Sequence, residues 1–156
     1  MEESLKELRG YFQLSDTEAG SYSPLTLAYI GDAVFEILVR YIVVSRMKVP
    51  VSKLHKVSSR IVCAEAQSAM TAAIEGEFTE EEERIYRRGR NAKSNTAAKN
   101  ASIVDYRRAT GFEAVIGYLF LKGEYDRLIR IFEKAIASTQ DGRGLLGEAA
   151  PGEEAF

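Results

Sequence analysis

Two apolar stretches, each with an acidic residue set into it, constrain the fold of this chain more than any other feature. The first runs from residue 27 to 39 and contains Asp32, and the second runs from residue 111 to 121 and contains Glu113. Both have the length and spacing of helices that pack into a protein core. A carboxylate in apolar surroundings is costly unless it is paired or binds a metal ion. We therefore expect two packed helices that bring Asp32 and Glu113 together around a divalent metal ion.

Local signals in the rest of the chain also favour helices. Serine followed by proline at positions 23 and 24 is typical of a helix start. Thr79 followed by Glu82 forms the pattern of a capping box, and Gly89 and Gly123 are suited to helix ends. No segment shows strand-like alternation, so the predicted fold class is all-α. We expect helices over residues 1–13, 24–47, 53–75, 79–88, 102–121 and 124–138, with a polar basic loop from residue 89 to 100.

The length of the chain and the composition of its C-terminal end suggest a single folded unit. Residues 1–138 are numerous enough to form one domain with a sizeable core. Residues 139–156 carry four glycines and one proline, a composition that favours disorder. We expect one helical domain over residues 1–138, followed by a disordered tail over residues 139–156.

The overall composition excludes several classes of protein. Of the 156 residues, 46% are hydrophobic and 28% are charged, which is typical of a globular protein. The single cysteine, Cys63, excludes an intrachain disulfide and a zinc site, and we expect it to be a small buried side chain in a helix. Glu36 and Arg40 interrupt the longest apolar run, so we expect no membrane span. The acidic N-terminus lacks a signal-peptide core, so we expect a cytoplasmic protein.

Positive charge is concentrated in one part of the chain, although the net charge is only −2. Residues 84–108 include eight arginines and lysines and one acid, Asp105. Within this region, residues 87–94 read RRGRNAKS, and arginine forks with exposed backbone donors suit phosphate groups. Alternatively, these residues form a charged surface that only contacts solvent. The same two interpretations, phosphate binding or a solvated surface, apply to a second basic group whose members lie about one helical turn apart. That second group consists of Lys53, His55, Lys56 and Arg60.

Three segments together resemble the ribonuclease III family. Residues 27–36, LAYIGDAVFE, look like the signature helix of that family, and residues 112–121, FEAVIGYLFL, look like its second acidic motif. The RRGRNAKS segment, and a chain too short for a double-stranded-RNA-binding domain, point within the family to the Mini-ribonuclease III group. The resemblance covers about residues 25–132, which is most of the expected domain.

The resemblance implies an all-helical catalytic domain that works as a homodimer on double-stranded RNA. Each of two active sites would hydrolyse one strand with Mg²⁺, leaving 5′-phosphate and 3′-hydroxyl ends. The implied substrate is precursor 23S ribosomal RNA, cut at its paired termini, with assistance from a ribosomal protein bound to that RNA.

The resemblance also assigns roles to particular residues. Asp32 and Glu113 match two acids of the family and would be the catalytic metal ligands. Two further family acids are missing, because Ala28 and Thr110 stand in their places. Fewer acids imply more water in the metal shell, and Glu36 or Asp105 are candidates to compensate. The candidate RNA-binding residues are Arg60, Arg88, Arg90, Asn91 and Lys93.

Two other functions are compatible with parts of the sequence. The missing acids at Ala28 and Thr110 would fit a catalytically inactive dimer that binds ribosomal RNA as an assembly factor. A helical protein-interaction domain without an RNA role would leave the basic segment and both embedded acids unexplained. We favour an Mg²⁺-dependent endoribonuclease because a pure binding module has little reason to place acids beside RNA.

Overall fold

The computed structural model describes residues 1–14, 18–93 and 102–147. Every regular element in these ranges is helical, as the sequence predicts. Two short 3₁₀ turns, Ala19–Ser21 and Glu75–Glu77, supplement the α-helices. The α-helices are α1 (Glu2–Phe12), α2 (Pro24–Arg46), α3 (Val51–Val62), α4 (Ala64–Ile74), α5 (Glu80–Asn91), α6 (Ile103–Lys122), α7 (Tyr125–Ala137) and α8 (Gln140–Leu146).

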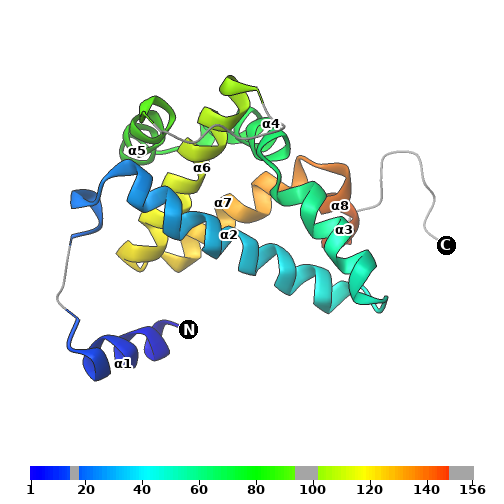
Figure 1. The fold of residues 1–156 in the computed structure, drawn as a ribbon, viewed down its shortest axis with the longest axis horizontal. Coiled ribbons are helices and arrows are strands. Elements are labelled where there is room, and N and C mark those ends of the chain that lie inside the picture. The colour runs from blue at the N-terminus through cyan, green and yellow to red at the C-terminus, as the bar shows by residue number, and fades with distance from the viewer. Residues whose placement is uncertain (15–17, 94–101, 148–156) are drawn as a thin grey trace.

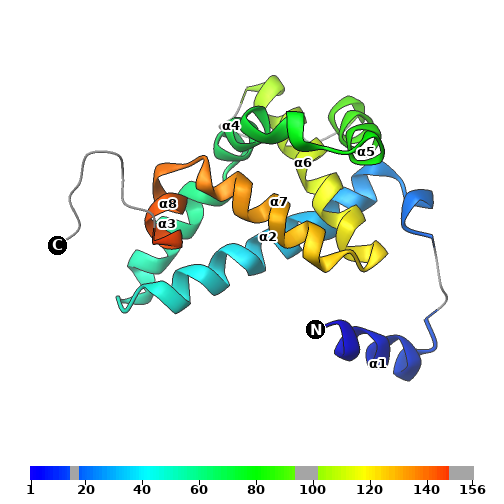
Figure 2. The ribbon, with the colours of Figure 1, turned by 180° about the vertical axis from the view of Figure 1, so that it is seen from behind.

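Helix α6 is the centre of the fold and packs against α2, α4, α5 and α7. Figure 1 shows α2 in front of α7, and the reverse view in Figure 2 shows α7 in front of α2. The ring of Phe35 on α2 meets those of Phe112 on α6 and Phe132 on α7 edge to face, with centroids 5.3 and 5.7 Å apart. These contacts form a shared core that fixes how α2 crosses α6.

Glycines allow α2 and α6 to touch through their backbones. A Cβ atom at Gly31 would lie 1.7 Å from the backbone oxygen of Glu113, and one at Gly117 would lie 2.0 Å from that of Leu27. Any larger residue would therefore force the two helices apart. Since Asp32 follows Gly31, this crossing brings Asp32 beside Glu113.

The predicted helix starts are confirmed where short-range capping determines them. The Ser23 hydroxyl accepts the backbone N–H of Thr26 at 3.2 Å, with Pro24 in the first helical position. Thr79 and Glu82 form the expected reciprocal capping box. The predicted helix end at Gly123 is also confirmed, because this residue follows the last residue of α6 and adopts a left-handed conformation with φ of 80°.

The predicted single helix over residues 53–75 is wrong. The chain forms two helices, α3 and α4, because Cys63 takes an extended conformation between them. The side chain of Cys63 is exposed, so our expectation of a buried helical cysteine is also wrong. Its thiol lies 3.5 Å from the backbone oxygen of Arg60, at the end of α3.

Gly89 does not end the fourth helix, because α5 continues to Asn91. A Cβ atom at residue 89 would lie 2.9 Å from the Cβ of Ala114 and 2.9 Å from the Cα of Gly111. The glycine therefore serves close packing of α5 on α6. Part of the predicted basic loop is accordingly helical, and residues 94–101 lie outside the described residues.

A further helix, α8, forms over residues that the composition assigns to the tail. Leu145 on α8 is buried, and Asp141 pairs with Arg60 on α3. Residues 148–156 lie outside the described residues. The division into a domain and a tail remains a prediction, and α8 belongs structurally with the helices before it.

The nearly continuous apolar composition of residues 24–47 predicts a helix that is buried on all sides, and this is wrong because only one side of α2 is buried. One face packs on α6, and the opposite face exposes a stripe of large apolar side chains, with Tyr29 81% and Tyr41 73% exposed. None of the described helices is long and apolar enough to cross a membrane. The stripe consists of Leu25, Tyr29, Ile37, Tyr41 and Val44.

Candidate active site

Asp32 on α2 and Glu113 on α6 lie together where the two helices cross. Their side chains are close enough for a hydrogen bond between the two carboxyl groups, and each group affects the pKa of the other. Glu113 is half-buried, as expected for an acid set in an apolar helix. The same expectation is wrong for Asp32, which is exposed because it sits at the margin of the α2 face that packs on α6.

The surroundings of Asp32 and Glu113 raise the pKa of both carboxyl groups and so favour their neutral, protonated forms. Burial raises the pKa of Glu113 to about 8, and the adjacent charge of Asp32 contributes to that rise. Partial desolvation raises the pKa of Asp32 as well, with a further contribution from the carboxylate of Glu36. In the described ranges, no lysine or arginine forms an ion pair with Asp32 or Glu113. Two neighbouring acids without a counter-charge create a site that favours a cation.

The residues at the positions of the two missing family acids supply no side chain that could replace a carboxylate as a metal ligand. Ala28 is buried and has no donor atom in its side chain. The hydroxyl of Thr110 donates to the backbone oxygen of Tyr106 at 2.9 Å. Neither position can replace a carboxylate in its present arrangement.

Neither candidate for compensation joins the pair as a third ligand. The Glu36 carboxylate accepts from Arg40 at 2.6 Å, one turn further along α2. The Asp105 carboxylate is hydrogen-bonded to Ser68 and Ser102, and these contacts lower its pKa. No group of three or more His, Cys, Asp or Glu side chains suited to a metal occurs among the described residues.

Two carboxylates at one point fit a hard divalent cation. Mg²⁺ prefers oxygen ligands and is often held by one or two carboxylates, with water and substrate phosphates completing its shell. Asp32 and Glu113 are the residues that would hold it, and the ion would relieve the repulsion that raises the pKa of Glu113. The chemistry that such an ion supplies is polarisation of a phosphate and activation of water.

A third side chain contacts this site, and the sequence analysis did not identify it. Gln67 on α4 is buried and donates a hydrogen bond to Glu113 that favours its ionised form. Its amide nitrogen also donates to the backbone oxygen of Val62 at 2.9 Å. The sequence did contain a signal, because Gln67 is a polar residue on the apolar face of its helix. That face could not be identified, because the helix break at Cys63 was not predicted.

The basic end of α5 lies against the same segment of α6. Gly89 packs on Thr110, Gly111 and Ala114, the residues on either side of Glu113. Arg88 donates to the backbone oxygen of Tyr22 at 3.4 Å, and the Arg90 guanidinium lies 5.6 Å from the centre of the Tyr86 ring. Arg88, Asn91 and Lys93 are exposed, and Arg90 is half-buried. Four of the five candidate RNA-binding residues are thus in or directly after the part of α5 that packs on the Glu113 segment of α6.

Arg60, the fifth candidate, lies on α3, two residues before the end of that helix, and not on α5. The Arg60 guanidinium donates two hydrogen bonds to Asp141 on α8, at 2.9 and 3.0 Å, and these raise its pKa. Arg60 is thus already paired within the chain, and its RNA-binding role remains a prediction.

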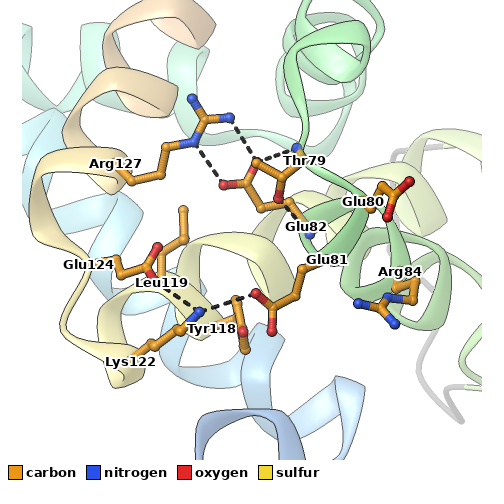
Figure 3. A pocket seen from close by; sticks show the side chains of 10 residues that line it. All are labelled: Thr79, Glu80, Glu81, Glu82, Arg84, Tyr118, Leu119, Lys122, Glu124 and Arg127. Atoms are coloured by element: carbon orange, nitrogen blue, oxygen red, sulfur yellow. Dashed lines mark hydrogen bonds and ion pairs between the residues drawn. The ribbon is translucent and has the colours of Figure 1, made fainter.

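The acidic start of α5 serves to anchor that helix. A cavity of about 670 Å³ lies beside this end of α5. Figure 3 shows Glu81 and Glu82 of α5 pointing towards Lys122 and Arg127, respectively. Arg127 donates two hydrogen bonds of 2.8 Å to the buried Glu82, and Lys122 lies 3.1 Å from Glu81 and 2.9 Å from Glu124. Because these acids are paired, we assign them a structural role: they fix the N-terminal end of α5 and hence the direction of its basic end.

Comparison with known proteins agrees with this arrangement. The model of the Ribonuclease III domain matches residues 25–124. A protein of Clostridium tetani named Mini-ribonuclease 3 is 49% identical over 133 residues, which cover 83% of this chain and 88% of that protein. A protein of Enterococcus faecalis with the same name is 51% identical over 106 residues, which cover 67% of this chain and 80% of that protein.

A solved structure supports the same fold. A crystal structure of a protein from Fusobacterium nucleatum superposes with a TM-score of 0.69 and 29% identity, over 74% of this chain and 93% of that one. The matched residues of the domain model include α2, α4, α5 and α6, which build the site described above. The chain therefore belongs to the ribonuclease III family of endoribonucleases, within the group named Mini-ribonuclease 3.

Proposed function

We propose that this protein is an Mg²⁺-dependent endoribonuclease that cuts double-stranded RNA at the paired ends of precursor 23S ribosomal RNA. The observation that carries the proposal is the pair of Asp32 and Glu113, which form no ion pair with a lysine or arginine of the described ranges and lie on helices next to α5. The family acts on double-stranded RNA and uses a divalent metal ion. The choice of Mg²⁺ rests on the all-oxygen ligands.

The two acids have different environments and hence different tasks. Asp32 is exposed and can meet a metal ion together with an incoming phosphate, whereas Glu113 is half-buried on α6 and interacts with Asp32 of α2 and Gln67 of α4. Glu113 must lose its proton to bind the ion, so metal binding and proton release are coupled at this residue. Mg²⁺ bound there would supply an activated water and stabilise charge on the phosphate, giving 5′-phosphate and 3′-hydroxyl ends.

The basic end of α5 is suited to hold the RNA. A-form duplexes are recognised through phosphates and 2′-hydroxyls rather than through base edges in their deep major groove. Arg88 and Lys93 supply exposed positive charge, and Asn91 supplies an exposed amide. Such contacts give salt-sensitive binding with little sequence preference, so selectivity would come from the shape of the precursor or from a ribosomal protein bound to it.

The exposed stripe on α2 is the proposed seam of a homodimer. The family acts as dimers, and a stripe of exposed large apolar residues along one helix is typical of a protein–protein interface. Asp32 lies at the edge of this stripe, three residues after Tyr29. Pairing two copies here would bring two acid pairs to one surface, one for each RNA strand. The Ile37→Asp variant should shift sedimentation from dimer to monomer, and an unchanged mass would place the seam elsewhere.

A cytoplasmic location accompanies this proposal, because precursor ribosomal RNA would be met there. The experiment that tests the function uses purified protein and a labelled duplex from the ends of precursor 23S ribosomal RNA. We expect discrete cuts with Mg²⁺, none with EDTA, and 5′-phosphate ends by end sequencing. Equal cleavage of every duplex would contradict the proposal that precursor 23S ribosomal RNA is the specific substrate. Binding to the precursor particle without cleavage would favour the alternative function, a catalytically inactive assembly factor.

A further inference from the structure

Gln67 is a fully buried polar side chain that uses only part of its hydrogen-bonding capacity. It is 1% exposed, in the middle of the first two turns of α4. Its amide nitrogen donates to the backbone oxygen of Val62 at 2.9 Å. Val62 is the last residue of α3, so its carbonyl has no partner further along that helix. Gln67 therefore links the α3–α4 junction to the site.

The contact with Val62 determines which way the amide of Gln67 points. A backbone carbonyl can only accept, so the nitrogen and not the oxygen of the amide must face Val62. The second N–H of the same nitrogen is the donor to the Glu113 carboxylate.

This orientation leaves the oxygen atom, Oε1 of Gln67, without a donor. The atom is buried, and no described residue donates a hydrogen bond to it. An unsatisfied buried acceptor destabilises the folded state, and an apolar side chain of similar length would fill the same space without that cost. A glutamine with a buried free acceptor next to the acid pair therefore indicates a ligand in this site rather than a packing role. Water is the smallest donor that fits such a polar position.

We propose that Gln67 is a positioning residue of the active site, whose nitrogen orients Glu113 and whose oxygen accepts a hydrogen bond from a water molecule bound to the divalent ion. The inference rests on the metal site proposed above and adds a residue to it. With only two carboxylates, most of the ion's ligands must be water, and the waters need acceptors behind them. Gln67 would supply one such acceptor on the protein side of the ion.

The test compares Gln67→Met with the unchanged protein and with Thr71→Val as a matched control. Methionine fills a similar volume and removes both the donor and the acceptor. Thr71→Val removes a buried hydroxyl from the same helix, and that hydroxyl donates to a backbone oxygen rather than to Glu113. Mn²⁺ affinity, measured by calorimetry without RNA, should weaken roughly 10- to 100-fold in Gln67→Met and stay unchanged in Thr71→Val. The Mg²⁺ concentration that gives half-maximal cleavage should also rise in Gln67→Met.

A second readout does not depend on the stability of each variant. The rise in Tm on adding Mn²⁺ should shrink in Gln67→Met and persist in Thr71→Val, whatever their Tm values in EDTA. If Gln67→Met fails to fold, Gln67→Leu replaces it in both measurements. Unchanged Mn²⁺ affinity and unchanged Mg²⁺ dependence in the folded variant would overturn the role of Gln67. Absence of Mn²⁺ binding to the unchanged protein would instead overturn the proposed metal site.

Discussion

Glu82 and Glu113 are both glutamates largely removed from water, yet their surroundings are opposite. Glu82 faces the guanidinium of Arg127 at 2.8 Å and accepts the backbone N–H of Thr79 at 2.9 Å, and hydrogen bonds of this kind lower its pKa despite burial. Glu113 faces another acid, Asp32, and its pKa is raised to about 8. The two residues lie on neighbouring helices, since Glu82 belongs to α5, which packs on α6, and Glu113 belongs to α6 itself.

The difference shows how to separate structural from functional acids in this fold. A buried carboxylate that has its counter-charge within the chain needs no further partner, and here the ion pair of Glu82 with Arg127 links α5 to α7. A carboxylate held beside a second carboxylate is complete only with a cation from outside. We therefore assign a structural role to Glu81 and Glu82 in the acidic run at residues 80–83, and we propose that the isolated acids in apolar helices form the metal site.

The largest expected effect comes from removing charge at the acid pair. Asp32→Asn should lower the rate of double-stranded RNA cleavage on the order of 10³-fold, because it removes a metal ligand without changing side-chain size. Its Tm in EDTA should stay the same or rise, since repulsion with Glu113 is relieved. Single-turnover cleavage and thermal melting check both parts, and cleavage at the original rate would remove Asp32 from the metal site.

The opposite outcome is expected at the structural acid. Arg127→Met would leave Glu82 buried without its counter-charge, at a cost of about 3 kcal/mol in the free energy of unfolding. For a chain of this size that corresponds to a loss of roughly 6–12 °C in Tm. Cleavage measured well below the new Tm should be retained. A variant as stable as the original would mean that the pair does not anchor α5.

The two ends of α5 should also behave differently towards salt. Replacing Arg88, Arg90 and Lys93 together by alanine should reduce the slope of log K for duplex binding against log salt by up to about 3, since each phosphate contact contributes about 1. The matched control replaces Lys53, Lys56 and Arg60 on α3. A larger effect in the control would place the RNA along α3 instead of the basic end of α5.

The smallest effect is a difference in pH dependence between the two glutamates. Because the folded-state pKa of Glu113 is raised from 4.5 to about 8, its contribution to stability is complete below pH 4.5 and lost as pH rises towards 8. The pKa of Glu82 is lowered, so its contribution is lost instead as pH falls below 4.5.

Thermal melting in EDTA should therefore show a Tm that declines by a few degrees between pH 5 and 8, and Asp32→Asn should flatten that decline. Saturating Mg²⁺ should stabilise the protein more at pH 8 than at pH 5, because Glu113 must release its proton to bind the ion. A Tm in EDTA that rises steadily from pH 5 to 8 in the original protein, with no change in Asp32→Asn, would contradict the shifted pKa.

Local chemistry made much of the fold predictable from the sequence. The Ser23–Pro24 start, the Thr79–Glu82 capping box and the Gly123 end depend on residues three or four positions apart, and all three occur as expected. The acids Asp32 and Glu113 were identifiable because each interrupts an apolar helix, and the structure brings them into contact.

Features that depend on tertiary packing were not predictable in the same way. The break at Cys63 contains neither glycine nor proline, so no local signal marked it. Gly89 looked like a helix end but serves the close approach of α5 to α6. The role of Gln67 depends on a neighbour 46 positions away in the sequence, Glu113, and only the folded chain shows that contact.

The most direct test of the central claim is an anomalous difference map from crystals of the protein grown with Mn²⁺. A cation at the acid pair should appear as a peak between the carboxylates of Asp32 and Glu113, and it should be absent in crystals of Asp32→Asn. A map with no peak there, or with its peak among the acids of residues 80–83, would contradict the assignment of the metal site.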